Sequence, residues 1–272
     1  MIPDCYARRY QALSNMLSGV NLIPKQQKPE NSIGDFFPNA KPHAFCHRWN
    51  ATEIADTFAQ TGCLAHWQKQ GFTQIWIELE NDIDPERHTL HVWTNLDDRS
   101  ELLMQLVVWL EYLNIERINA SYPAFCVEHL RLQTPNATFI HPKLPGQDFA
   151  PSGILRRIFG ILKSWAATLG AEIITEIPEY FHTAAIFSPY FTFIDTEMEA
   201  LFRAIRRDLI PQITPQTLAQ ISHAFEQNRI RQNDTPILWP TEMQAYPLSH
   251  DLAQKLHIPP QIIAQDRFSL IL

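Results

Sequence analysis

Glycine is the residue that this sequence lacks most. The 272 residues include 8 glycines and 20 prolines, whereas an average content of about 7% would give roughly 19 glycines. Because glycine lets a backbone approach a phosphate closely, this scarcity excludes most glycine-rich cofactor loops. The sequence accordingly contains neither a Walker loop nor a Gly-x-Gly-x-x-Gly fingerprint.

Other absences narrow the class of protein further. The four cysteines (Cys5, Cys46, Cys63 and Cys126) are too few and too scattered for a disulfide scaffold. No run approaches the roughly 18 apolar residues of a membrane-spanning helix, and no signal-peptide core follows Arg9. The net charge of −7 argues against a nucleic-acid partner, which would favour a basic face. We therefore expect a soluble, cytoplasmic protein without a membrane or nucleic-acid partner; its oligomeric state stays open.

Apolar residues are abundant enough for a substantial core. Hydrophobic residues make up 45% of the sequence and charged residues 19%, which excludes wholesale disorder. Prolines and glycines among polar residues indicate an irregular N-terminal arm over residues 1–45. Residues 46–272 are predicted to form one α+β body, with helices flanking a mixed central sheet and a helical last third. Two αβ halves, 46–135 and 136–272, are the alternative.

Helical and strand patterns alternate along this body. The segments that bear on function are a helix over 100–113, a strand over 116–120, a helix over 123–132, a strand over 138–141, a helix over 153–169 and a strand over 172–177. A tryptophan precedes a proline at a similar distance in two places, Trp109 to Pro123 and Trp165 to Pro178. This echo suggests a duplicated αβ unit, but two ordinary units with similar turns explain it equally well.

One loop between a predicted strand and a predicted helix has the features of an anion site. It runs from His141 to Gly153 and leads directly into the helix over 153–169. The free N–H groups and the dipole of a helix N-terminus favour a phosphate or another anion. The candidate ligand-binding residues lie in this loop and in the first helical turn: Gly146, Gln147, Ser152, Gly153 and Arg156.

Residues 136–195 resemble the GCN5-related N-acetyltransferases. That family places a Gln/Arg-x-x-Gly-x-Gly/Ala loop after a strand, and then a helix, a strand and an Asn-x-x-Ala-x-x-Tyr segment. Gln147 and Gly153 match the two ends of the loop, and Ala184 matches the alanine, whereas Phe187 replaces the tyrosine and no glycine matches the middle of the loop. The resemblance implies that the loop binds the pyrophosphate of acetyl-CoA or of another acyl-CoA.

The same resemblance implies a divergent acyl-CoA-dependent N-acyltransferase with an unknown amine substrate, a small molecule or a protein. Glu179 or His182, which lies near the family's asparagine, would take the proton of the attacking amine. Tyr190 would protonate the leaving thiolate, a role that Tyr180 could also fill. A splay between the strands at 138–141 and 172–177 would mark this fold.

A non-catalytic binding or assembly protein that keeps the same architecture is the alternative function. Pro151, which has no N–H to offer a phosphate, and Phe187, which has no acidic proton, both favour it. A measurement of CoA binding discriminates between the two hypotheses.

Two sets of potential metal ligands occur in the sequence. Glu-x-x-His at Glu179 and His182, with Glu176 before it, has the spacing of half a di-iron site, but the second half is missing. Another set has the pair spacing of a structural zinc site: His43, Cys46, Cys63 and His66. We expect no metal, and zinc at the second set is the open alternative.

Overall fold

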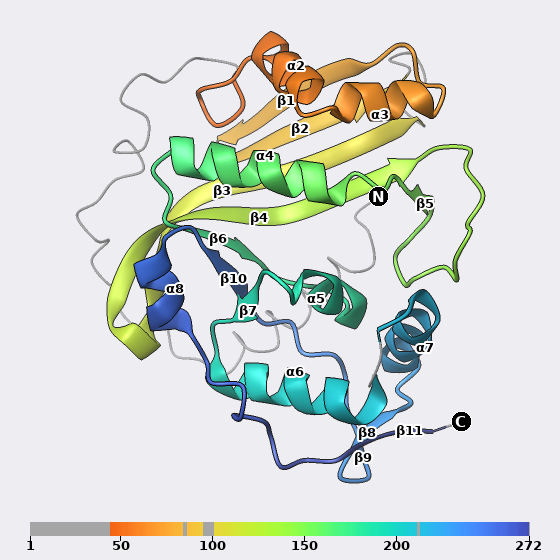
Figure 1. Ribbon diagram of the computed structural model, residues 1–272, viewed down its shortest axis with the longest axis vertical. Coiled ribbons are helices and arrows are strands. Elements are labelled where there is room, and N and C mark those ends of the chain that lie inside the picture. Colours follow the sequence, from red (N-terminus) through yellow and green to blue (C-terminus); the bar gives the residue numbers. More distant parts are fainter. Residues whose placement is uncertain (1–43, 84–85, 95–100, 211–212, 272) are drawn as a thin grey trace. The chain divides into compact units, whose positions relative to one another are not determined.

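Figure 1 shows the computed structural model, which describes residues 44–83, 86–94, 101–210 and 213–271. Residues 1–43 of the predicted arm lie outside the described residues, so the boundary between the arm and the body stays a prediction. Within the described ranges, no helix is both long and apolar enough to cross a membrane.

A mixed sheet, with eight strands among the described residues, forms the centre of the structure. Its strands are β1 (Trp76–Ile83), β2 (Glu86–Trp93), β3 (Leu102–Ile115), β4 (Ala120–Thr134), β5 (Ala150–Pro151), β6 (Ile173–Glu176), β7 (Thr192–Phe193) and β10 (Gln244–Pro247). The order is β1-β2-β3-β4-β6-β10-β7, and β5 pairs with β4. All neighbours are antiparallel except β4 and β6, which are parallel.

Helices from two parts of the chain cover one face of this sheet (Figure 1). They are α2 (Ala51–Gln60), α3 (Cys63–Lys69) and α4 (Leu155–Thr168). A capping box between Asn50 and Glu53 starts α2, and Gly62, at φ +76°, turns the chain into α3. Phe58 and Trp67 are fully buried against the apolar side chains of the strands, so this face holds one core of the protein.

The opposite face is covered around β10 by α8 (His250–Leu256), which Ser249 caps. Leu252 and Leu256 belong to the same apolar cluster as Ala245 of β10 and Cys126 of β4. A 3₁₀ turn, η2 (Glu116–Ile118), joins β3 to β4. The parallel strands β4 and β6 therefore have an apolar layer on each face, as is typical of parallel strands.

A second apolar core lies next to β7. It is built by α5 (Phe181–Phe187), α6 (Thr196–Leu209) and α7 (Pro215–Glu226), with a small sheet of β8 (Ile230–Gln232), β9 (Thr235–Pro236) and β11 (Phe268–Leu270). Phe181 packs its ring against those of Phe202, Phe225 and Trp239, at centroid distances of 5.9, 5.5 and 5.3 Å. Helices and short strands alternate here, so the prediction of a helical last third is not confirmed.

The predicted class, a mixed sheet flanked by helices, is confirmed, but two predicted helices are strands. Residues predicted as a helix over 100–113 form β3, and those predicted over 123–132 form β4. A continuous apolar run suits either structure. Burial alternates from Met104 to Leu110, as in a strand with one covered face.

The sequence echo does not correspond to a structural repeat. Trp109 lies in strand β3, whereas Trp165 lies in helix α4. The two stretches therefore have different local structures, which removes the support they gave to two αβ halves. Residues 138–141, all of them described, form no strand, and β4 is the parallel neighbour of β6 instead.

Candidate functional site

The parallel strands β4 and β6 pair over a short part of β4. The pairing ends at Val127 and Glu176, while β4 continues to Thr134. At the same point the register between β3 and β4 shifts by one residue, which leaves Glu128 as a β-bulge. A bulge bends a strand and increases its twist, so it directs β4 away from the end of β6. The crossover through α4 starts from β4 beyond this point and returns to β6 at Ile173, the opposite end of the paired stretch.

A pocket of about 610 Å³ opens at the N-terminus of α4. Its lining comes from the start of α4 and the end of α5: Gly153, Leu155, Arg156, Arg157, Phe159, Ile186, Phe187 and Tyr190. No described side chain caps α4, whose N-cap residue is Ile154. Arg156 and Arg157 are both exposed and add positive charge to the free N–H groups of the first turn. This end of the pocket therefore favours an anion.

Aromatic rings also line this pocket. The ring of Phe159 lies 5.3 Å from that of Tyr190 and 5.5 Å from that of Phe191, and Phe187 lies 5.6 Å from Phe191. Tyr190 is 48% exposed, so its phenol can meet a ligand. Phe187, which replaces the tyrosine of the resembling family, lines the same pocket without an acidic proton.

Other predicted residues gather in a separate group around Tyr180. A Cβ at Gly146, which has φ +73°, would lie 2.9 Å from the ring of Tyr180, and that ring stacks on His182 at 5.3 Å. His182 is buried, and burial together with the neighbouring His223 lowers its pKa to about 4. His223 in turn bonds the carbonyl of Lys143 at 2.8 Å. His182 is thus neutral and enclosed, which makes it a poor base for a substrate.

The remaining predicted residues do not line the pocket at the N-terminus of α4. Gln147 accepts a hydrogen bond from the N–H of Leu144 at 3.0 Å and so closes its own loop. Ser152 is buried, and its carbonyl is bonded to His66 Nε2 at 2.8 Å. Glu179 is exposed. The structure therefore brings Gly153, Arg156 and Tyr190 to one pocket, places Gly146 and His182 elsewhere, and leaves every assigned role a prediction.

Sequence reasoning placed Glu176 only in half of a di-iron site and missed Gln244, its direct partner in the pairing of β6 with β10. Gln244 is fully buried, and burial raises the pKa of Glu176 from 4.5 to about 8. A carboxyl group whose pKa lies near neutral pH is a candidate acid or base. A glutamate at the end of an apolar strand was the available signal, but its partner lies far away in the sequence.

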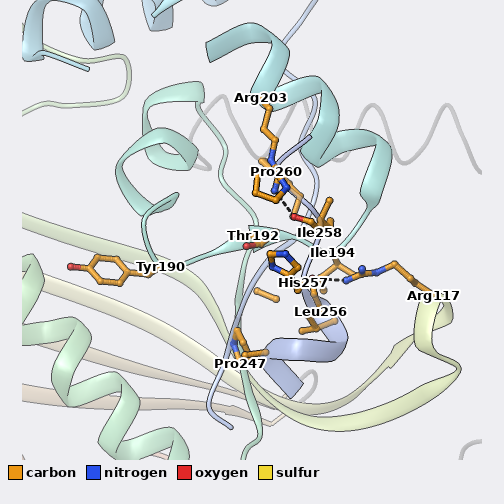
Figure 2. Close-up of a pocket in the computed structure, with 13 residues that line it drawn as sticks. Arg117, Tyr190, Thr192, Ile194, Arg203, Pro247, Leu256, His257, Ile258 and Pro260 are labelled. Carbon is orange, nitrogen blue, oxygen red and sulfur yellow. Dashed lines mark hydrogen bonds between the residues drawn. The ribbon is translucent and has the colours of Figure 1, made fainter. Parts of the chain in front are cut away.

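A smaller pocket of about 270 Å³ also touches Tyr190 (Figure 2). Two arginines line it, and they hold the backbone at the end of α8 and just after it. Arg117 donates to the carbonyl of Leu256 at 3.0 Å, and Arg203 donates to that of Ile258 at 3.0 Å. The ring of Tyr190 points away from this pocket in Figure 2. The arginines therefore fasten a chain segment, and we assign this pocket no ligand.

Three of the four predicted zinc ligands lie in the described part of the chain. His43 lies outside the described residues, and Cys46, Cys63 and His66 do not gather in the part that is described. Within that part, one other group of potential ligands has its donor atoms within 4.8 Å of one another, on β1 and β2: Glu78, Glu80 and His91.

Comparisons with known proteins add little to this geometry. No protein-family model matches the chain, and no curated protein matches it in sequence. Among solved structures, the chain is similar to a crystal structure of nourseothricin acetyltransferase, at 15% identity and a TM-score of 0.24. The match covers 44% of this chain and 71% of that chain. We base no conclusion on a likeness at this level.

Proposed function

We propose that this protein is an acyl-CoA-dependent N-acyltransferase. The observation that carries the proposal is the pocket at the uncapped N-terminus of α4, which Arg156 and Arg157 line together with the aromatic side chains near Tyr190. This helix follows the carboxyl end of β4, and ligands of open sheets bind outside the carboxyl ends of strands. The sequence resemblance to acetyltransferases covers the same segment.

The residues suit an acyl-CoA at both ends of the pocket. The N–H groups of the first turn and the two guanidinium groups match phosphates. The apolar side chains of Phe159, Ile186 and Phe187 match a less polar arm. Pro151 offers no N–H, so the arginines must supply more of the phosphate contacts than in the resembling family. A bound acyl-CoA supplies an acyl group activated as a thioester.

The chain's own residues must then move two protons. As the new carbon–nitrogen bond forms and the carbon–sulfur bond breaks, one proton leaves the amine and one is given to the sulfur. Tyr190, whose half-exposed phenol lines the pocket, is suited to give the second. The enclosed His182, whose pKa is lowered to about 4, is poorly suited to take the first, and the exposed Glu179 is the other predicted acceptor.

Acetyl-CoA binding tests the proposal. A ligand that binds only the folded state stabilises it by about 2.7 kcal/mol at 100 times its dissociation constant, so millimolar acetyl-CoA should raise the melting temperature. Arg156→Gln should lose most of this rise. The matched control, Arg267→Gln, removes a largely exposed arginine just before β11 and should keep the rise. No rise in the wild type would overturn the proposal.

The second candidate is a non-catalytic binding protein of the same architecture. Phe187 favours it, because this side chain stands in the pocket where the resembling family has a tyrosine. Acetyl-CoA binding without release of free thiol in the presence of a panel of primary amines would support this candidate. Thiol release that Tyr190→Phe abolishes would exclude it.

A further inference from the structure

Two glutamates and a histidine come together on the face of the sheet that points away from α2, α3 and α4. Successive side chains of a strand alternate between the two faces. Leu90 of β2 is part of the apolar core under these helices, and Leu79 of β1 packs against that core. Glu78, Glu80 and His91, which alternate with these leucines, therefore point to the opposite face, where His91 is the direct cross-strand partner of Glu78.

The donor atoms of these three side chains are close enough to share one ion. One potential ligand atom from each residue lies within 4.8 Å of the others. Ligand atoms that lie about 2.1 Å from a metal ion are roughly 3–4 Å from one another. Glu80 is exposed, so its side chain can rotate through the remaining distance without moving the core. The two strands thus place three ligands almost at binding distance.

Neighbouring side chains hold two of these ligands in place. The indole N–H of Trp93 donates to Oε2 of Glu78 at 2.9 Å, and the rings of Trp93 and His91 lie 5.3 Å apart. From β3, the amide nitrogen of Gln105 lies 3.1 Å from Nε2 of His91. Outer contacts of this kind orient the ligands of metal sites and decide which ring nitrogen carries the proton. This support distinguishes the group from a chance gathering of surface carboxylates.

The contact with Gln105 leaves Nδ1 of His91 as the nitrogen for a metal. A metal binds the ring nitrogen that carries no proton, so an ion at Nδ1 keeps the proton on Nε2. The amide of Gln105 accepts a hydrogen bond from this N–H when its oxygen faces the ring. Half a rotation of the amide is sufficient, because its oxygen and its nitrogen are the two equivalent ends of a planar group.

The charge on this face favours a divalent cation. Glu78 and Glu80 bring two carboxylates together, and two like charges in one place disfavour ionisation unless a cation compensates them. Burial, Arg131 and His91 lower the pKa of His129 to about 4, so this imidazole is neutral at pH 7 and offers the carboxylates no charge. Arg131 lies in the same row as His91 but two strands farther along, which is roughly 10 Å by the spacing of strands.

We propose that Glu78, Glu80 and His91 bind a divalent transition-metal ion that keeps open positions for water. An imidazole with two carboxylates suits zinc or manganese better than magnesium or calcium, which prefer oxygen ligands alone. Three protein ligands leave at least one position free, unlike the closed shell of a structural zinc site. The inference is independent of the proposed acyl transfer, because neither β1 nor β2 lines the pocket at the start of α4.

Calorimetric titration of the full chain with Zn²⁺ tests the site, and Mg²⁺ is the comparison ion. We expect the wild type to bind Zn²⁺ much more tightly than Mg²⁺. Glu80→Gln and His91→Gln should each weaken Zn²⁺ binding by roughly tenfold or more, because each removes a ligand. Glu80→Gln changes an exposed side chain and so leaves the fold intact.

The matched controls are Glu172→Gln and His250→Gln, which change exposed residues outside the group and should keep the wild-type affinity. A wild type that binds no Zn²⁺, or binding that neither Glu80→Gln nor His91→Gln weakens, would overturn the proposal.

Pulsed EPR with Mn²⁺ as the probe tests the imidazole ligand directly. The wild type should show coupling of the manganese to an imidazole nitrogen, and His91→Gln should lose it. Coupling that persists in His91→Gln would overturn the proposal. Gln105→Leu removes only the contact with Nε2, and we expect it to weaken Zn²⁺ binding by about 10–100-fold. An unchanged affinity in this variant would contradict the role given to Gln105.

Discussion

Replacing Glu176 by glutamine should change how the stability of the protein depends on pH. The pKa of this carboxyl is about 8 in the folded protein, against an ordinary value of 4.5. Because the folded-state pKa is raised, the carboxyl's contribution to stability is fully present below pH 4.5 and is lost as the pH rises towards 8. Each pH unit in this window corresponds to about 1.4 kcal/mol. Glutamine has the same shape but cannot ionise.

The assay is urea denaturation of the wild type and of Glu176→Gln at several pH values between 5 and 8. The difference in unfolding free energy between the two proteins should grow in favour of the variant by roughly 4 kcal/mol across this window. Glu172→Gln is the matched control, because this exposed glutamate lies immediately before β6. Parallel curves for Glu176→Gln and the wild type would refute the reasoning.

Four further substitutions test the packing around the site and the core by the same denaturation assay. Gly146→Ala should lower the stability more than Gly153→Ala. Both glycines have positive φ, and an alanine in that conformation costs about 1–2 kcal/mol, but only the Cβ at position 146 would also meet the ring of Tyr180. Equal losses would contradict this contact. Asp195→Ala should cost about 1 kcal/mol, because it removes the N-cap of α6, and an unchanged midpoint would exclude that role. Trp67→Ala should cost about 3–5 kcal/mol, because its side chain is fully buried, and a loss below 1 kcal/mol would contradict that burial.

Local signals in the sequence were enough to predict much of the fold. The helix predicted over 153–169 corresponds to α4, and the strand predicted over 172–177 contains β6. The apolar run from Leu102 to Leu113 was assigned the wrong periodicity, because its residues suit a helix as well as a strand. Sheet partners decided between the two, and a single sequence does not show its partners.

The candidate site could be predicted only where its residues are neighbours in the chain. Gly153 and Arg156 belong to one helix start, and the structure places them at the pocket as expected for such a terminus. Gly146 was assigned to the same site, but a long loop carries it to Tyr180 instead. Glu176 and Gln244 meet through strand pairing between distant segments. No periodicity or spacing in the sequence encodes that contact.

A crystal structure of the protein with acetyl-CoA would test the central claim most directly. The proposed function predicts phosphate oxygens within hydrogen-bonding distance of the first-turn N–H groups of α4 and of Arg156, with the acyl group directed towards the place where β4 and β6 part. Acetyl-CoA bound away from the start of α4, or absent at a saturating concentration, would contradict the account.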